Sequence, residues 1–204
     1  MNILAIGAHP DDIEFGCGGA LINLAKGGHN AYLLVMTKGE VGGSSAVRKR
    51  EQDKAAAYMG ARKVFFGEFS DTCVPTDKKL ITAVENVITK VDPDLVFLNY
   101  YNDIHQDHRA IANGGLSATR YVKNVLFYEV PTTREFEPDI FFDIGNVLEE
   151  KMALLKIHSS QVHKTKVPRL TILESAQSCA IFRGYQGRVK FAEGFKSLRY
   201  LISL

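Results

Sequence analysis

Short apolar runs alternate with segments of helical periodicity along most of this chain. Apolar runs predict strands near residues 2–8, 31–37, 63–67, 94–99 and 124–129. Helical spacing between them predicts helices over 15–27, 46–59, 77–90 and 107–119. This alternation is typical of βαβ units with right-handed crossovers, and it predicts an α/β fold: a Rossmann-like three-layer sandwich with a mostly parallel sheet.

The last third of the chain is less regular than the rest. Residues 140–144 predict one further strand, and residues 146–158 have the spacing of a helix. We expect residues 168–187 to form loops and short strands that close over a site. Because the 204 residues are 46% apolar and show no repeat or clear linker, we expect a single domain over residues 1–204.

A polar cluster follows the first apolar run, where a strand gives way to a loop. It reads Ala8-His9-Pro10-Asp11-Asp12-Ile13-Glu14. Neutral imidazole and ionised carboxylate are ligands that a divalent metal such as Zn²⁺ takes, and a neighbouring carboxylate can accept a proton from an activated water. An ordinary turn and helix start is the alternative, because Pro and Asp are common in both.

A second cluster, Asp103-Ile104-His105-Gln106-Asp107-His108, follows the fourth apolar run. Strands that end at the same edge of a parallel sheet deliver their loops to one crevice, so the two clusters are expected to meet there. His9 and Asp12 then need a third ligand, which either His105 or His108 could supply. The alternative for these two histidines is a pair of exposed polar side chains.

Together these residues resemble the zinc-dependent N-deacetylases of the PIG-L/LmbE-like family, which remove acetyl groups from molecules that contain N-acetylglucosamine. The first and fourth of the matching blocks are specific in combination, whereas the others are weak singly. The blocks are Gly7-Ala8-His9-Pro10-Asp11-Asp12 with Gly18-Gly19, Thr37-Lys38-Gly39-Glu40, Arg48-Lys49-Arg50-Glu51 with Ala55-Ala56 and Gly60, His105-Gln106-Asp107-His108, and His158-Ser159-Ser160-Gln161, together with Asp71.

The resemblance implies that His9, Asp12 and His108 hold the metal and that Asp11 is the general base. Two nitrogens and one carboxylate suit Zn²⁺, and they also suit Fe²⁺ or Co²⁺. Hydrolysis of an acetamide needs an activated water, and Zn²⁺ lowers the pKa of its water to about 7. Asp11 can accept the proton of this water and deliver it to the departing amine.

The resemblance further implies that His105 stabilises the tetrahedral oxyanion, with Asp107 beside it. A nearby acid would favour the imidazolium form of His105, although the two-residue spacing leaves open whether Asp107 touches it. One departure from the family is Gln106, where many members have Pro between the two histidines. We expect this difference to change loop stiffness more than chemistry.

Three further residues are expected to shape the substrate pocket. Glu40 lies in a glycine-rich turn after the second strand, at the same sheet edge as His9. Arg48 is a basic residue at a helix start, where the helix dipole favours acids, and Asp71 follows the third strand. Arg48 and Asp71 match family positions that contact the sugar. A solvated loop, a solvated surface position and a turn are the respective alternatives.

Composition argues against several other classes of protein. The balance of 25 basic and 23 acidic residues gives a net charge of only +2, so nucleic acid is not an expected partner. No apolar stretch approaches the roughly 20 residues that span a bilayer, so no membrane association is expected. Cys17, Cys73 and Cys179 indicate no disulfide framework, and with no signal peptide visible the expected location is cytoplasmic. Cys17 is expected to be a buried residue of the first helix, although a thiolate ligand is the alternative.

The sequence therefore predicts a metal-dependent hydrolase that acts on the N-acetyl group of a small amino-sugar substrate or glycoconjugate. One alternative is a nucleotide- or dinucleotide-binding Rossmann-like protein, but two acids and a proline in the first loop are poorly suited to a pyrophosphate. The other alternative is a non-catalytic sugar-binding module, which would have no need of the base Asp11. By resemblance alone, the chain is also a candidate homo-oligomer.

Overall fold

The computed structural model describes residues 1–202 of the chain. One seven-stranded sheet runs through these residues and is flanked by helices. The strands are β1 Asn2–Gly7, β2 Asn30–Thr37, β3 Lys63–Phe69, β4 Leu95–Asn99, β5 Asn124–Tyr128, β6 Ile140–Asp143 and β7 Ala192–Arg199. The helices are α1 Asp12–Lys26, η1 Glu40–Gly42 (a 3₁₀ turn), α2 Ser45–Met59, α3 Lys78–Val91, α4 Gln106–Ala118, α5 Leu148–Ile157 and α6 Ile172–Gly187.

The strands lie in the order β3-β2-β1-β4-β5-β7-β6. The first five along the chain pair in parallel, whereas β7 is antiparallel to both β5 and β6. The order reverses direction between β1 and β4, which pair in register with Ile3 opposite Leu95 and Ala5 opposite Phe97. In open α/β sheets, this reversal opens a crevice at the carboxyl ends of the two strands, where ligands bind.

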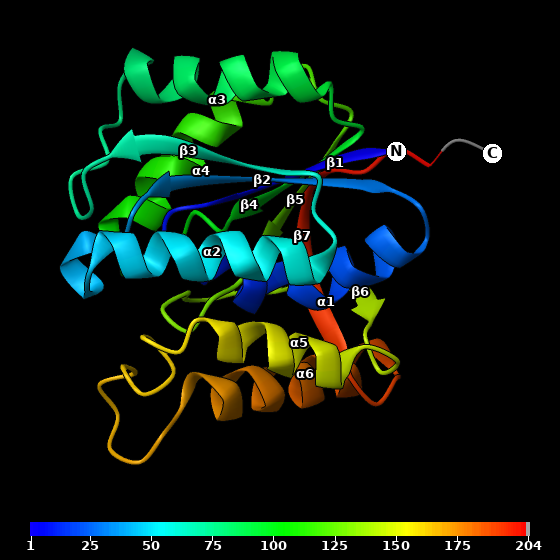
Figure 1. The fold of residues 1–204 in the computed structure, drawn as a ribbon. Coiled ribbons are helices and arrows are strands. Elements are labelled where there is room, and N and C mark those ends of the chain that lie inside the picture. The colour runs from blue at the N-terminus through cyan, green and yellow to red at the C-terminus, as the bar shows by residue number, and fades with distance from the viewer. Residues whose placement is uncertain (203–204) are drawn as a thin grey trace.

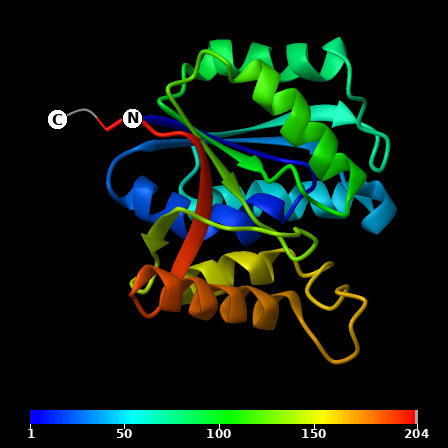
Figure 2. The same cartoon turned by 180° about the vertical axis from the view of Figure 1, so that it is seen from behind.

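Helices cover both sides of the sheet, which confirms the three-layer α/β prediction. Figure 1 shows α3 on one side and α1, α2, α5 and α6 on the other, and the reverse view in Figure 2 shows α4 on the side of α3. α5 packs against α1, α2 and α6. None of the described helices combines the length and apolar character needed to cross a bilayer.

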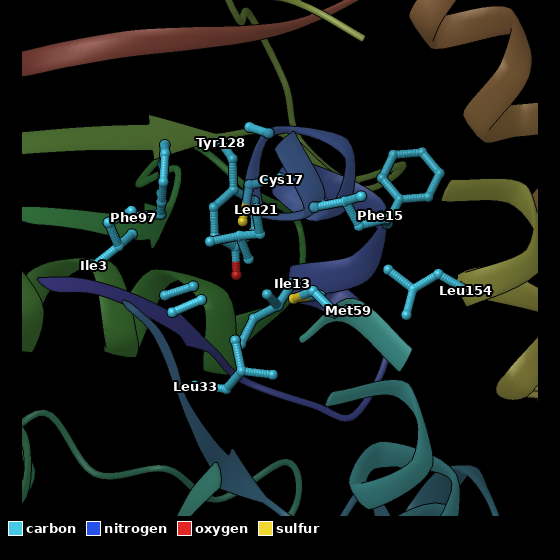
Figure 3. Close-up of a cluster of buried hydrophobic side chains, with 14 of the residues drawn as sticks. Ile3, Ile13, Phe15, Cys17, Leu21, Leu33, Met59, Phe97, Tyr128 and Leu154 are labelled. Carbon is cyan, nitrogen blue, oxygen red and sulfur yellow. The ribbon is translucent and has the colours of Figure 1, made fainter. Parts of the chain in front are cut away.

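α1 is buried from Asp12 to Ile22 because it lies between the sheet and α5. Gly16 permits its close approach to the sheet, since a Cβ at this position would lie 2.0 Å from the ring of Tyr128. Cys17 lies in the apolar cluster on this side, together with Leu21 and Tyr128 (Figure 3). Cys17 is fully buried, which confirms a buried core residue, and this burial raises the pKa of its thiol and disfavours a thiolate ligand.

The predicted strands and helices of the first 130 residues are confirmed, with ends shifted by up to three residues. The predicted strand at 140–144 and helix at 146–158 are also present, as β6 and α5. The expectation for residues 168–187 was wrong, because α6 occupies most of this segment. Exposed apolar residues such as Ile181, Phe182 and Tyr185 obscure its amphipathic pattern, but the capping box formed by Thr171 and Glu174 is a signal that the sequence offered.

A buried ion pair joins α5 and β7 beneath α1. Lys151 Nζ lies 2.6 Å from Glu193 Oε1, and Lys151 also donates to the carbonyl of Phe15. The Glu193 carboxylate accepts hydrogen bonds from the backbone N–H groups of Gly19 and Ala20. These contacts hold the centre of α1, which carries site residues at its start, against β7 of the sheet.

Replacing Lys151 with Met is expected to lower the free energy of unfolding by about 3–5 kcal/mol, because the Glu193 carboxylate then stays buried without a counter-charge. Chemical denaturation measures the change. Lys156→Met, an exposed position on the same helix, is the matched control. Adding Glu193→Gln to Lys151→Met should recover part of the loss. A loss for Lys151→Met no larger than that of the control would contradict this account.

Candidate metal centre and active site

The two sequence clusters meet at the crevice between β1 and β4, as expected. His9 lies in the loop that follows β1, and Asp12 begins α1. His105 is the N-cap residue of α4, which follows β4, and His108 lies in the first turn of that helix. Although nearly a hundred residues separate them in sequence, the His9 and His108 side chains are in contact.

Three donor atoms form a tight triangle in this crevice. His9 Nδ1 lies 3.5 Å from Asp12 Oδ2 and 3.3 Å from His108 Nε2, and His108 Nε2 lies 3.2 Å from Asp12 Oδ2. Ligand atoms placed about 2.0–2.2 Å from a tetrahedral zinc ion lie roughly 3.3–3.6 Å from one another. The triangle therefore fits a small divalent metal in both donor chemistry and spacing.

His9 also belongs to two wider groups of close donor atoms, one with His105 and His108 and the other with Asp71 and Asp107. In each group the donor atoms lie within 4.8 Å of one another. The second group surrounds His9 Nε2, the ring nitrogen opposite the one that faces Asp12. The imidazole of His9 thus has Nδ1 on the side of the triangle and Nε2 on the side of the Asp71 and Asp107 carboxylates.

Carboxylates lie behind both histidines of the triangle. His9 Nε2 is 2.9 Å from Asp71 Oδ1 and 3.2 Å from Asp107 Oδ2, and His108 Nδ1 is 3.2 Å from Asp103 Oδ2. Metal-binding histidines usually donate their second N–H to a carboxylate, which sets the tautomer and orients the ring. The arrangement therefore leaves His9 Nδ1 and His108 Nε2 free to bind a metal.

The carboxylates of Asp71 and Asp107 both lie close to His9 Nε2. The Asp107 carboxylate accepts hydrogen bonds from the backbone N–H groups of Thr72 and Val74 and faces His9, whereas only its backbone N–H contacts His105. Asp71 is buried, and its Oδ1 faces His9 Nε2. Burial raises the pKa of Asp71, but its contact with His9 and the Val41 N–H lower that pKa to about 2 overall.

Sequence reasoning gave no role to Asp103, which lies behind His108. Besides facing His108, its carboxylate accepts hydrogen bonds from His105 N and Thr133 Oγ1. Its only signal in the sequence is its position inside the second cluster. Asp103 precedes His105 by two residues and His108 by five. The sequence does not show which histidine it faces, because that depends on the conformation of the loop after β4.

His105 lies against the two triangle histidines but keeps part of its surface exposed. Its ring centroid is 4.6 Å from that of His9 and 4.7 Å from that of His108. Because His105 Nδ1 accepts the N–H of Asp107, the neutral ring carries its proton on Nε2. Burial and the nearby charges of His9 and His108 lower the pKa of His105 in the metal-free protein, which favours the neutral ring there.

Asp11 is the other partly exposed group, with 25% of its side chain accessible. Burial raises the pKa of Asp11 to about 6, although the charge of Arg48 opposes this rise. A carboxylate with a pKa near neutrality is suited to accept and return a proton. Asp11 and His105 are thus two proton-exchanging groups that remain partly exposed, whereas the residues of the ligand triangle are buried.

The side chains of Arg48 and Glu40 form contacts with other residues of this chain. Arg48 is only 5% exposed, so a solvated surface position is wrong, and its guanidinium contacts Asp11. Glu40 Oε1 accepts the backbone N–H of Asp71, while Asp71 Oδ2 accepts that of Val41. The two carboxylates therefore form a reciprocal clamp between the η1 turn and the loop after β3.

We expect Asp103→Asn to weaken the affinity for Zn²⁺ by about 10–100-fold, because the ring of His108 loses its charged partner. Competition with a chromophoric chelator measures the affinity. Asp53→Asn, at an exposed position of α2, is the control and should leave the affinity unchanged. Equal affinities for Asp103→Asn and the control would contradict the assignment of His108 as a ligand.

Metal binding is also expected to depend on pH. Burial lowers the pKa of His108, but the carboxylates of Asp12 and Asp103 raise it overall to about 9. In the metal-free protein His108 is therefore protonated at neutral pH and must lose this proton to bind a metal. The apparent affinity for Zn²⁺ should rise about tenfold per pH unit for each proton released, and the contribution of His108 to this rise should level off above about pH 9. Calorimetry in buffers of different ionisation enthalpy measures the release; binding without proton release would contradict the expectation.

Residues 4–119 of the chain match the protein family described as PIG-L: GlcNAc-PI de-N-acetylase. The matched range contains every residue of the ligand triangle, as well as Asp11 and His105. A relative in Escherichia coli (strain K12), named "Uncharacterized deacetylase YaiS", is 36% identical over 171 residues, which cover 78% of this chain and 91% of the relative.

Solved structures share the fold. The N,N'-diacetylchitobiose deacetylase of Pyrococcus horikoshii superposes with a TM-score of 0.86 at 22% identity, covering 96% of this chain and 83% of that one. GalB, the 4-carboxy-2-hydroxymuconate hydratase of Pseudomonas putida, also superposes with a TM-score of 0.86, at 23% identity over 100% of this chain and 99% of that one. Because a deacetylase and a hydratase share this fold, the side chains of the site must carry the functional argument.

Proposed function

Because this chain belongs to the PIG-L family, we propose that it is a zinc-dependent deacetylase that hydrolyses the N-acetyl group of an N-acetylglucosamine-type amino sugar or small glycoconjugate. The observation that carries the proposal is the position of Asp11 and His105. Both are partly exposed beside a triangle of donor atoms whose spacing suits a metal. Such a pair provides a base and a hydrogen-bond donor for amide hydrolysis.

In the proposed site His9, Asp12 and His108 hold the metal. Burial raises the pKa of Asp12, but His108 and His9 lower it well below its usual range, so this carboxylate is ionised as a ligand must be. The backbone N–H groups of Ala8 and His9 also bind Asp12 Oδ2 and orient it. The bound ion supplies an acidified water and a Lewis acid for the amide carbonyl. Two nitrogens and one oxygen favour Zn²⁺, with Fe²⁺ or Co²⁺ as substitutes.

Asp11 and His105 perform the proton transfer and the charge stabilisation. Asp11 accepts a proton from the attacking water as the new carbon–oxygen bond forms, and it then returns that proton to the amine nitrogen as the carbon–nitrogen bond breaks. His105 donates its Nε2–H to the oxygen that becomes negative in the tetrahedral intermediate. Acetate and the free amino sugar are the products, so water is the only co-substrate.

The acidic first loop argues against a dinucleotide site. In Rossmann-like proteins, the pyrophosphate lies at the N-terminus of the helix that follows the first strand. Here the carboxylates of Asp11 and Asp12 lie at the start of α1 and would repel it. A non-catalytic sugar-binding module would leave the free base Asp11 without a purpose, and turnover separates that alternative from the proposal.

Asp11→Asn is expected to lower kcat for acetate release by about 10²–10⁴-fold, because the amide cannot accept the proton of water. Release of acetate and free amine from a panel of N-acetylated sugars by the zinc-loaded protein is the measurement. The control is Asp53→Asn, which should retain the wild-type rate. Removal of the metal with a chelator should abolish turnover, and Zn²⁺ should restore it.

Two results would contradict the proposal. One is a zinc-loaded wild-type protein that releases no acetate from any sugar of the panel, which would favour a binding module or another reaction of this fold. The other is a full rate for Asp11→Asn, which would show that a different group moves the proton.

A further inference from the structure

The block of residues 158–161, His-Ser-Ser-Gln, has no part in the proposed reaction, although it lies close to the site. It follows α5 and packs onto α2. The Glu51 carboxylate of α2 accepts hydrogen bonds from Ser159 Oγ at 3.1 Å and from the backbone N–H and hydroxyl of Ser160 at 2.8 and 2.6 Å. The last residue of the block donates to a carbonyl of the η1 turn at 3.4 Å. The block therefore joins the chain after α5 to two elements that border the site.

His158, the first residue of the block, points inward and is only 1% exposed. Its Nε2 lies 3.6 Å from Glu14 Oε2 of α1, while Gln52 Nε2 of α2 donates to Glu14 Oε1 at 2.6 Å. Burial lowers the pKa of His158, but the carboxylates of Glu14, Asp11 and Glu51 raise it overall, which favours the imidazolium. A buried cation and a buried amide thus face the two oxygens of one carboxylate.

Glu14 lies in the first turn of α1, three residues after the proposed base. Asp11 is the N-cap residue of this helix and has a positive φ of 107°. Because the hydrogen-bonded turns of a helix move together, a carboxylate fixed at Glu14 also fixes the point at which Asp11 leaves the helix. The contacts of Glu14 with His158 and Gln52 therefore bear on the position of the base.

The same two helices meet a second time at the base itself. Gln52 and Arg48 are four residues apart and lie on one face of α2. Arg48 Nη2 donates to Asp11 Oδ2 at 3.3 Å, just as Gln52 donates to Glu14. A shift of Glu14 relative to α2 would therefore also move Asp11 relative to Arg48.

Stability alone gives a weak account of the pair formed by His158 and Glu14. Replacing a buried ion pair with apolar residues of similar volume is often neutral or stabilising. Within residues 1–202, Glu14 Oε2 and both ring nitrogens of His158 are also buried without a hydrogen-bond partner, which adds to the cost of burial. The pair therefore contributes little net stability, and its main effect is to fix the position of α1.

We propose that His158 is a positioning residue for the base Asp11. It acts through Glu14, whose carboxylate it holds against α2, and its burial keeps it from contact with the substrate. This inference rests on the proposed function, because Asp11 is the base of that reaction. The sugar contact expected for Arg48 is independent of it.

The kinetics of His158→Leu test the positioning role. We expect kcat to fall by about 10–100-fold, because misplacing a catalytic group by about 1 Å costs on the order of 10²-fold. KM should change by less than about threefold, since the substrate loses no contact. The affinity for Zn²⁺ should also stay within about threefold, because the N–H groups of Ala8 and His9 still orient Asp12. His163→Leu, an exposed histidine in the same loop, is the matched control.

Two further variants separate positioning from a folding defect. His158→Leu alone leaves the Glu14 carboxylate buried without its counter-charge, whereas Glu14→Gln/His158→Leu removes both charges. The double variant should be folded by circular dichroism and chemical denaturation and should still have the low kcat. His158→Gln, whose amide can donate to Glu14, should recover part of the lost kcat. A crystal structure of the double variant should show the Asp11 carboxylate displaced from Arg48 by about 1 Å.

The inference is overturned if the folded double variant has the wild-type kcat, or if it raises KM while kcat is retained. It is also overturned if the crystal structure of that variant keeps Asp11 Oδ2 at 3.3 Å from Arg48 Nη2. Failure of the proposed function is a separate result: the wild-type protein would release no acetate from any sugar of the panel, and the crystal structure would still decide whether His158 positions Asp11.

Discussion

The parallel pairing of β1 with β4 is the constraint on which the site depends. These strands are distant in sequence, and their register brings the loop that carries His9 beside the helix start that carries His108. The order of strands reverses at this pair, so no crossover helix covers the crevice between their ends. The buried ion pair of Lys151 and Glu193 helps to fix the position of Asp12, because it holds α1, which begins at Asp12, against the sheet.

The electrostatics of the crevice also favour a bound cation. Four carboxylates, those of Asp12, Asp71, Asp103 and Asp107, surround two imidazoles within hydrogen-bond distances. Without a metal, the protonated histidines balance part of this charge, and the pKa of His9 accordingly lies well above its usual value despite the lowering effect of burial. A divalent ion supplies the same positive charge and leaves the histidines neutral. The carboxylates therefore favour both protonation of the histidines and binding of a metal between them. Protons and the metal compete for the same ring nitrogens.

The sequence alone predicted the strands other than β7, a mostly parallel sheet and the meeting of the two clusters, because strand periodicity and strand ends are local signals. It did not predict the order of the strands in the sheet. It did not predict which nitrogen of His9 each carboxylate faces, since the partners of Asp71 and Asp107 depend on how the loops after β3 and β4 turn. It also missed α6 and the antiparallel β7, whose exposed apolar and charged residues mask the usual patterns. Local patterns thus predict the elements, whereas contacts between loops decide the roles.

The strain at Asp11 follows from placing the proposed base directly before a proposed metal ligand. The Asp12 carboxylate turns back to bind the N–H groups of Ala8 and His9, so the chain must reverse between these residues. Pro10 has a restricted φ, which leaves Asp11 to make the turn with a positive one. The Asp11 side chain contacts Arg48 and stays partly exposed. Arg48 donates hydrogen bonds to the Pro10 carbonyl and to the Asp11 carboxylate, so it contacts both residues at the centre of this turn.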